Sequence, residues 1–246
     1  MKKILTAALL VCVFALPVFA EDKLYKTVRV GFDIDYTMPA MDQVNTQISS
    51  GGNDVVEINA GIAGMLDIEV AMAPFIMAGI RGGYVYCFPG SASYLLDFNN
   101  QTVNAALIPV EIGVSTNFDL ASTPISIMAG IYGGYGFAMA SYENNYDILG
   151  VTAKSIQPFD GAGFIGEFMA SINYRMESGL SVNINGGYRL AKIMQLKQSS
   201  DVTYTDSLGF SHTAGEKGDV LKDSDNNDLA FDYSGFNIGA GISMGF

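Results

Sequence analysis

The chain has little of several residue types that often carry a function. Among 246 residues there is no tryptophan, one histidine and two cysteines. One cysteine, Cys12, lies in an N-terminal apolar run, which leaves Cys87 without a partner for an internal disulfide. Basic residues are also scarce, because 13 Lys and Arg face 25 Asp and Glu for a net charge of −12. Without a basic patch, the chain is not expected to bind nucleic acid through its phosphates.

The first twenty residues have the layout of a secretory signal. Lys2 and Lys3 precede an apolar run over residues 4–19, and Val18-Phe19-Ala20 places small residues where a signal peptidase reads them. A single membrane-spanning helix is the alternative, but the run is short, contains Pro17 and is followed directly by polar residues. We therefore predict a cleaved signal peptide over residues 1–20 and a mature chain over residues 21–246.

Beyond residue 20 the chain lacks any run of 18 apolar residues, which excludes a helical membrane span there. Yet 49% of the residues are hydrophobic and only 15% are charged, so the apolar surface must be hidden in another way. Apolar and polar residues alternate with a period of two in eight segments, which is the pattern of β-strands. The segments are 28–36, 56–70, 76–88, 108–118, 125–137, 164–175, 180–190 and 236–246.

Charged residues within these segments all fall on the side opposite the aliphatic residues. They are Arg29, Asp33, Asp35, Glu57, Asp67, Glu69, Arg81, Glu111, Glu167, Arg175 and Arg189. A transmembrane β-barrel explains this pattern, because an Arg or Lys facing lipid near mid-membrane costs roughly 2–4 kcal/mol. Lys26, Asp160 and Lys192 break the rule, but they lie at strand ends, where that cost is small.

The connections between segments alternate in length. Residues 37–54, 89–102, 142–158 and 193–232 are long, whereas 71–74, 119–124 and 177–179 are short. Outer-membrane barrels have short periplasmic turns and longer external loops. We therefore predict an all-β fold, a single eight-stranded antiparallel up-and-down transmembrane β-barrel. Pro109 should cause a bulge or kink, because proline removes a hydrogen bond from the strand ladder.

The last segment resembles the terminal-strand signal that delivers bacterial outer-membrane barrels to their assembly machinery. Its residues are Phe236, Ile238, Ala240, Ile242, Met244 and Phe246. With its eight segments, the mature chain resembles the small-barrel group that includes the OmpA membrane domain, OmpX and OmpW. This resemblance implies a Gram-negative-type outer membrane, with membrane lipid and the barrel assembly machinery as partners. Without tryptophan, an aromatic girdle would consist of Tyr36, Tyr86, Phe88, Phe118, Tyr174 and Phe246.

An eight-stranded barrel has an interior just wide enough for its own side chains. Because buried charges must be paired, we predict a lumen closed by an ion-pair network. Its members are Arg29, Asp33, Glu57, Arg81, Glu111, Glu167, Arg175 and Arg189. The function we expect is a structural or surface-interaction role, with the long loops free to contact host or surface ligands.

Two other functions fit the same pattern less well. The first is OmpW-like passive transport of a small hydrophobic molecule, for which Met128, Met139 and Met169 would line an apolar path. The second is a water-soluble ligand-binding barrel of the lipocalin type. That interpretation would leave the outward aliphatic faces exposed to water, and soluble monomers rarely expose such large apolar patches.

Enzymatic and metal-binding functions are not expected. Some small barrels resemble lipid-modifying enzymes, which need a serine with a histidine base and an orienting carboxylate. The sole histidine, His212, lies in the longest connection, where no scaffold holds it. Asp223-x-Asp225-x-Asn227 resembles the start of a calcium loop, but Asp228 and Ser234 replace its turn glycine and terminal glutamate. We predict no catalytic residues, no metal and no cofactor.

Overall fold

In the computed structural model, the described residues are 28–50, 52–94, 99–120, 123–148, 151–176, 178–206, 208–223 and 225–246. The predicted signal peptide and Lys26 lie outside them. The elements are β1 (Val28–Pro39), α2 (Asp42–Ser49), β2 (Asn53–Val56), β3 (Gly61–Ala73), β4 (Ile76–Tyr94), β5 (Asn99–Asp119), β6 (Ile125–Ile148), β7 (Val151–Arg175), β8 (Leu180–Leu190), β9 (Lys192–Ile193), β10 (Lys197–Gln198), β11 (Val202–Thr205), β12 (Ser211–Gly215), β13 (Phe231–Asp232) and β14 (Gly235–Gly245).

The main sheet closes on itself as an antiparallel ring. Its neighbours run in the order β1, β3, β4, β5, β6, β7, β8 and β14, and β14 pairs with β1 to complete the ring. The described residues contain fourteen strands in all, because β2 and β9 to β13 lie in the connections between ring strands. Because the ring is closed, the ring strands have no free edge over the height at which they are all present.

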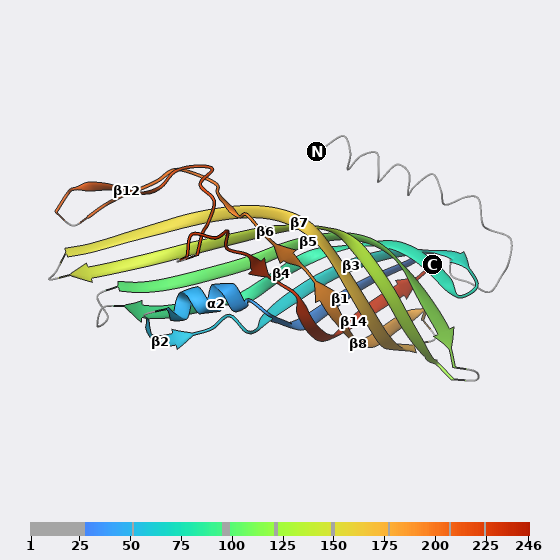
Figure 1. The fold of residues 1–246 in the computed structure, drawn as a ribbon. Coiled ribbons are helices and arrows are strands. Elements are labelled where there is room, and N and C mark those ends of the chain that lie inside the picture. Colours follow the sequence, from blue (N-terminus) through green and yellow to red (C-terminus); the bar gives the residue numbers. More distant parts are fainter. Residues whose placement is uncertain are drawn as a thin grey trace.

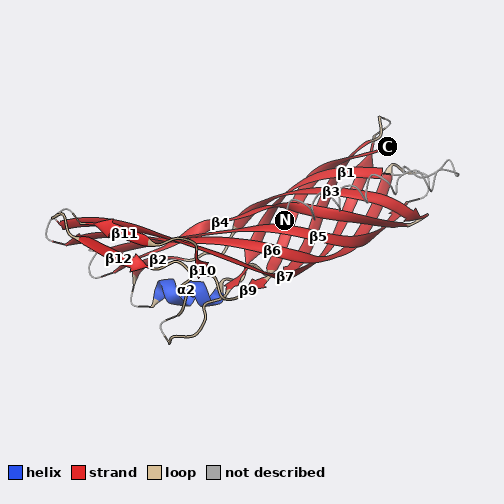
Figure 2. Cartoon of the chain, turned by 90° about the horizontal axis from the view of Figure 1, so that it is seen from above, coloured by secondary structure: helices blue, strands red, loops and turns tan. Residues whose placement is uncertain are grey.

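The ring strands differ greatly in length. β1, β8 and β14 have 12, 11 and 11 residues, whereas β4, β5, β6 and β7 have 19, 21, 24 and 25. The four longer strands therefore continue past the ring, and Figures 1 and 2 show them as an arm at the end opposite the C-terminus. The arm is defined here as residues 88–94, 99–106, 139–148 and 151–160.

The arm corrects two of the predicted loops. Residues 89–102 and 142–158 are mostly strand, since β4 runs to Tyr94, β6 to Ile148 and β7 begins at Val151. Their outward positions carry polar residues such as Asn104, Ser141 and Lys154, so the aliphatic alternation that marks the ring strands stops there. The predicted loops 37–54 and 193–232 are connections, but they contain α2, β2 and β9 to β13.

Of the bulge or kink predicted at Pro109, the bulge is wrong. Opposite Pro109, the pairs Gly82↔Val110 and Val85↔Leu107 keep the same register. The register shifts instead between Cys87 and Gly90, next to Pro89. A bulge reverses which face each residue presents, and beyond it Gly90 faces inward against Ile48 and Ile58.

Candidate functional site: the barrel interior

Glu167 lies at the centre of a buried ionic cluster. On the neighbouring strand β8, Arg189 donates from Nε (3.1 Å) and Nη2 (2.7 Å) to Glu167 Oε2. Arg81 reaches across the lumen from β4 and donates from Nη1 to Glu167 Oε1 (2.6 Å). Asn237 on β14 donates to the same oxygen (2.9 Å). These four side chains are buried, so strands that are not all adjacent are joined through one carboxylate.

Two aspartates on β1 also lie close to the Arg81 guanidinium. Asp35 Oδ2 lies 3.6 Å and Asp33 Oδ2 lies 3.8 Å from Arg81 Nη2. Asn183 also donates to Asp33 Oδ1 (3.1 Å). We call Arg81, Glu167, Arg189, Asp33, Asp35 and Asn237 the ionic layer. Burial removes the hydration of these charged groups, and their pairing offsets that cost. The ionic layer therefore holds the strands together but adds little net stability.

A second cluster surrounds Glu69. Arg29 Nη2 lies 2.6 Å from Glu69 Oε2 and 3.7 Å from an oxygen of Asp67. The other Glu69 oxygen accepts hydrogen bonds from the hydroxyls of Ser115 (2.7 Å) and Tyr132 (2.6 Å). The guanidinium of Arg81 lies 5.9 Å from the Tyr132 ring centroid, so a cation–π contact links the two clusters. Near this cluster, Arg29 also lines a cavity of about 300 Å³, together with Asn173, Ser181 and Ser243.

On the arm side of the ionic layer, the interior becomes apolar. The connection between β8 and β14 places Ile193, Leu196, Leu229, Phe231 and Tyr233 inside, all fully buried. They pack with Val85, Leu107 and Ile165 of the wall and with Met41, Val44 and Ile48 from the β1–β3 connection. We call the five residues of the β8–β14 connection the apolar plug.

Small wall residues make room for the apolar plug. A Cβ at Gly161 would lie 3.0 Å from Leu196 Cγ, and one at Gly163 would lie 3.0 Å from Ile193 Cδ1. The Tyr233 hydroxyl donates to the carbonyl of Ala106 on β5 (2.9 Å), which satisfies its buried polar atom. β9 and β13 also pair through Phe231 and Ile193, so the connection is held by both backbone and side-chain contacts.

The structure brings together six of the eight predicted lumen residues: Arg29, Asp33, Arg81, Glu111, Glu167 and Arg189. Glu57 is exposed and precedes β3, because the Asn45 side chain binds both the N–H and the carbonyl of Ile58 and turns Ile58 inward. Arg175 is also exposed and pairs with Asp119 at the barrel rim (2.8 Å). Placing these two residues in the lumen was therefore wrong.

Several interior residues were not singled out from the sequence as site residues. Asn183 and Asn237 donate to carboxylates, and Ser115 and Tyr132 donate to Glu69. A sequence signal for them did exist, since each has the same inward parity as the charged residues. The apolar plug carried no such signal, because an apolar residue in a connection does not reveal where it packs.

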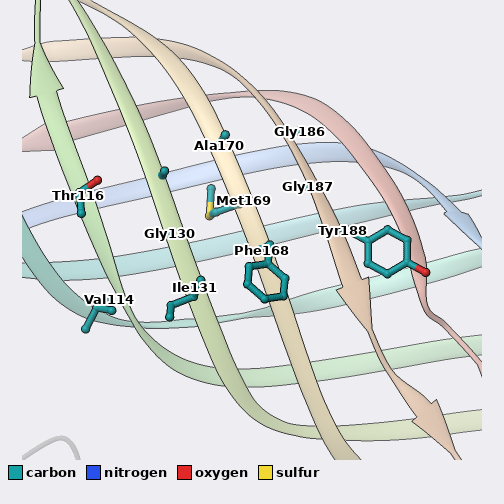
Figure 3. Close-up of a pocket in the computed structure, with 11 residues that line it drawn as sticks. Val114, Thr116, Gly130, Ile131, Phe168, Met169, Ala170, Gly186, Gly187 and Tyr188 are labelled. Carbon is teal, nitrogen blue, oxygen red and sulfur yellow. The ribbon is translucent and has the colours of Figure 1, made fainter.

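The outward face of the ring is aliphatic and aromatic. Phe164 is 84% exposed, Ile112 69% and Ile184 68%. The predicted girdle residues Tyr36, Tyr86, Phe88, Phe118, Tyr174 and Phe246 are all exposed, with Phe88 at the start of the arm. A hollow of about 550 Å³ lies in the wall, where Val114, Ile131, Phe168 and Tyr188 surround paired small residues (Figure 3). Met169 also lines it, whereas Met139 is exposed on the outer surface.

The loop residues considered for chemistry make local contacts. His212 Nε2 lies 3.1 Å from Asp206 Oδ2, and this hydrogen bond, with the backbone N–H of Phe210, lowers the pKa of the Asp206 carboxyl. The hydroxyl oxygens of Ser211 and Thr205 lie 3.3 Å apart, so Ser211 is hydrogen bonded to Thr205 rather than to His212. The backbone N–H of Asn227 lowers the pKa of Asp223, whose Oδ1 also accepts from the N–H of Asp225. Both carboxylates therefore serve as turn caps.

Two features are absent from the described part of the chain. No helix there is long and apolar enough to cross a membrane. No group of three or more His, Cys, Asp or Glu side chains in the same residues is arranged to hold a metal ion.

Comparison with known proteins finds no matching family model and no matching curated protein. Among solved structures, the chain is similar to Neisserial surface protein A, with 8% identity, 89% of this chain and 97% of that chain covered, and a TM-score of 0.43. It is similar to the outer membrane protein OprG from Pseudomonas aeruginosa, with 10% identity, coverages of 90% and 96%, and a TM-score of 0.44. A major outer membrane protein from Thermus thermophilus has 12% identity, coverages of 89% and 99%, and a TM-score of 0.45.

Proposed function

We propose that this protein is an outer-membrane barrel of eight membrane-spanning strands, with a structural or surface-interaction role and a lumen closed by its own side chains. The ring strands β1, β3, β4, β5, β6, β7, β8 and β14 would span the membrane. The arm and its covering connections would lie outside, and the short turns would face the periplasm. No catalytic step is part of this proposal.

The observation that carries the proposal is the reversal of inside and outside. Large apolar side chains point out of the ring, whereas Glu69, Glu111, Glu167 and Arg189 are buried within it. A water-soluble protein has the opposite arrangement, since soluble monomers rarely expose apolar patches of more than a few hundred Å². Hydrocarbon around the ring removes this conflict, because lipid-facing and lumen-facing residues alternate along a transmembrane strand.

Two layers in series support a closed lumen. The ionic layer joins β1, β4, β7, β8 and β14 across the interior. The apolar plug fills the interior on the arm side, with side chains from the β8–β14 connection packed against the wall. A solute passing through would have to displace both.

Passive transport through the lumen has less support. Met139, one of three methionines expected to line an apolar path, is exposed on the outer surface. Met128 and Met169 pack with Tyr132, and Met169 Sδ accepts from Arg81 (3.4 Å), so they join the polar clusters rather than a separate channel.

Partners follow from the same geometry. Phe236, Ile238, Ile242 and Met244 are exposed along the outward face of β14, and Phe246 is exposed directly after it. The barrel assembly machinery and then lipid would contact these residues. The arm and the β11–β12 hairpin are the parts that would meet surface or host ligands. Leu208 and Phe210 are exposed at the hairpin tip.

The test is planar-bilayer recording on the refolded protein, with outer-membrane fractionation of the expressed protein beside it. We expect a folded, heat-modifiable species in the outer-membrane fraction that adds no steady conductance to the bilayer. Steady conductance from every inserted molecule would contradict the closed lumen. Recovery of the folded protein in the soluble fraction would contradict the membrane assignment itself.

A further inference from the structure

Acidic groups outnumber basic groups inside the ring. Among the described residues, the interior carboxyl groups belong to Asp33, Asp35, Asp67, Glu69, Glu111 and Glu167. The guanidinium groups facing them belong only to Arg29, Arg81 and Arg189. Six carboxylates would leave this low-dielectric space with an excess of negative charge, and an isolated buried carboxylate is among the costliest groups that a protein can hold. Part of this charge must therefore be neutralised.

Glu111 is the carboxyl with the fewest partners. It is 1% exposed, and neither of its carboxylate oxygens accepts a hydrogen bond from any described residue. The ladder explains this isolation. Its register partner on β4 is Arg81, whose Nη1 is turned across the lumen to Glu167, and its register partner on β6 is Gly134, which has no side chain.

The other interior carboxylates are better compensated. Glu167 accepts from two guanidiniums and an amide, and Glu69 accepts from two hydroxyls beside Arg29. Asp33 accepts from Asn183, Asp35 lies beside Arg81, and Asp67 lies 3.7 Å from Arg29 Nη2. Only Glu111 combines complete burial with two oxygens that lack a donor among the described side chains.

We propose that Glu111 is a proton-binding site inside the closed barrel, and this inference rests on the proposed membrane barrel. The proton adds to one carboxylate oxygen and makes the group neutral, so that its burial no longer places an uncompensated charge in the lumen. A metal ion is a poorer occupant. No described cluster of three or more ligands surrounds the site, and the adjacent Arg81 guanidinium would repel a cation.

Loss of the proton would disturb the ionic layer. The charged groups that act on Glu111 are Glu167 on β7, Arg189 on β8 and Arg81 on β4. Around them lie Asp33 and Asp35 on β1, Asp67 on β3 and Tyr132 on β6. An ionised Glu111 would repel Glu167 and compete with it for both guanidiniums. The folded barrel would bind one proton more than the unfolded chain between the pH at which the unfolded glutamate ionises and the higher pH at which Glu111 loses its proton, so its stability falls as pH rises through this range.

Infrared spectroscopy of the full mature chain, folded in lipid bilayers, tests the site directly. A protonated carboxyl group has a carbonyl stretch that is separate from the carboxylate bands. We expect this band in the wild-type protein at neutral pH and its loss in Glu111→Gln, which replaces the neutral acid with a neutral group of the same shape. The matched control is Glu57→Gln, which removes an exposed carboxylate and should leave the band unchanged.

Identical spectra for wild type and Glu111→Gln in the protonated-carboxyl region would overturn the proposal, as would intensity lost only from the carboxylate bands. If Glu111→Gln does not fold, Glu111→Asp replaces it in the test, because it should shift the protonated-carboxyl band rather than remove it.

Thermal unfolding is the second readout. As pH rises from mildly acidic values through neutral, the wild type should lose stability relative to Glu111→Gln, and parallel curves would count against the site. The band is independent of conductance, so a conducting barrel would refute the closed lumen without deciding on Glu111.

Discussion

Glu167→Leu is expected to lower the free energy of unfolding by about 3–5 kcal/mol, the usual cost of removing one partner from a buried ion pair. Glu167 is the acceptor for both Arg81 and Arg189, so the variant leaves Arg189 without its carboxylate and Arg81 with only the longer contacts to Asp33 and Asp35. Its loss also frees the Asn237 amide, and a buried donor without an acceptor adds a further penalty. The measurement is denaturant unfolding in lipid vesicles, followed by the gel shift of the folded band.

The matched control for this prediction is Asp119→Leu. It also removes a carboxylate hydrogen bonded to an arginine, but both Asp119 and Arg175 are exposed at the rim. Exposed pairs contribute about 0–1 kcal/mol, so this variant should unfold close to wild type. Equal destabilisation by the two substitutions would mean that the interior pair is as hydrated as the rim pair, and the ionic layer would not exist as described.

Opening the lumen is expected to require damage to both layers. Arg81→Ser with Glu167→Ser removes one charge of each sign from the ionic layer and leaves the apolar plug in place. Ile193→Asp with Phe231→Asp places two buried charges in the β9–β13 ladder and should expel the plug, because buried charges without partners are costly. Each double variant alone should add no steady conductance to a planar bilayer, whereas the four substitutions together should.

The control for plug expulsion is Met194→Asp, a charge in the same segment at an exposed position. It should leave the bilayer silent in combination with the two serine substitutions. Steady conductance from the serine pair alone would show that the apolar plug does not seal the barrel. Silence of the four-substitution variant, with its folded gel band intact, would show that another barrier closes the lumen.

The wall of the barrel could be predicted from the sequence because the proposed membrane would impose a strict rule on it. Each residue facing hydrocarbon would have to be apolar, so the alternation at Ile112, Val114 and their neighbours marks the strand and its face. The same rule explains the errors. Past Met139 the outward positions are Ser141, Glu143 and Asn145, so the arm strands lose the signal and were predicted as a loop.

The partners inside the barrel could not be predicted from the same pattern. A period of two says which face a side chain is on, but not how far it reaches. By register, Arg81 lies between Asp67 and Glu111, yet its side chain crosses the lumen to Glu167. The position of Glu57 was predicted wrongly for a related reason. The hydrogen bonds between Asn45 and Ile58 end the alternation of inward and outward residues before β3 begins.

The apolar plug depends on contacts that are distant in sequence. Ile193, Leu196 and Phe231 lie in or next to strands of only two residues, where no periodicity identifies a buried face. Their positions are determined by the space that the missing side chains of Gly161 and Gly163 leave inside the wall and by the hydrogen bond from the Tyr233 hydroxyl to the Ala106 carbonyl. Such complementarity becomes visible only after the wall is assembled.

Fluorescence quenching by brominated lipid tests most directly which medium surrounds the ring. The chain has no tryptophan, so Ile112→Trp introduces a single reporter at an outward position, and Leu208→Trp introduces one at the hairpin tip. In vesicles whose acyl chains carry bromine, we predict strong quenching at position 112 and none at 208, with aqueous acrylamide giving the reverse. Position 112 quenched by acrylamide and untouched by brominated chains would place the aliphatic face in water and contradict the membrane barrel.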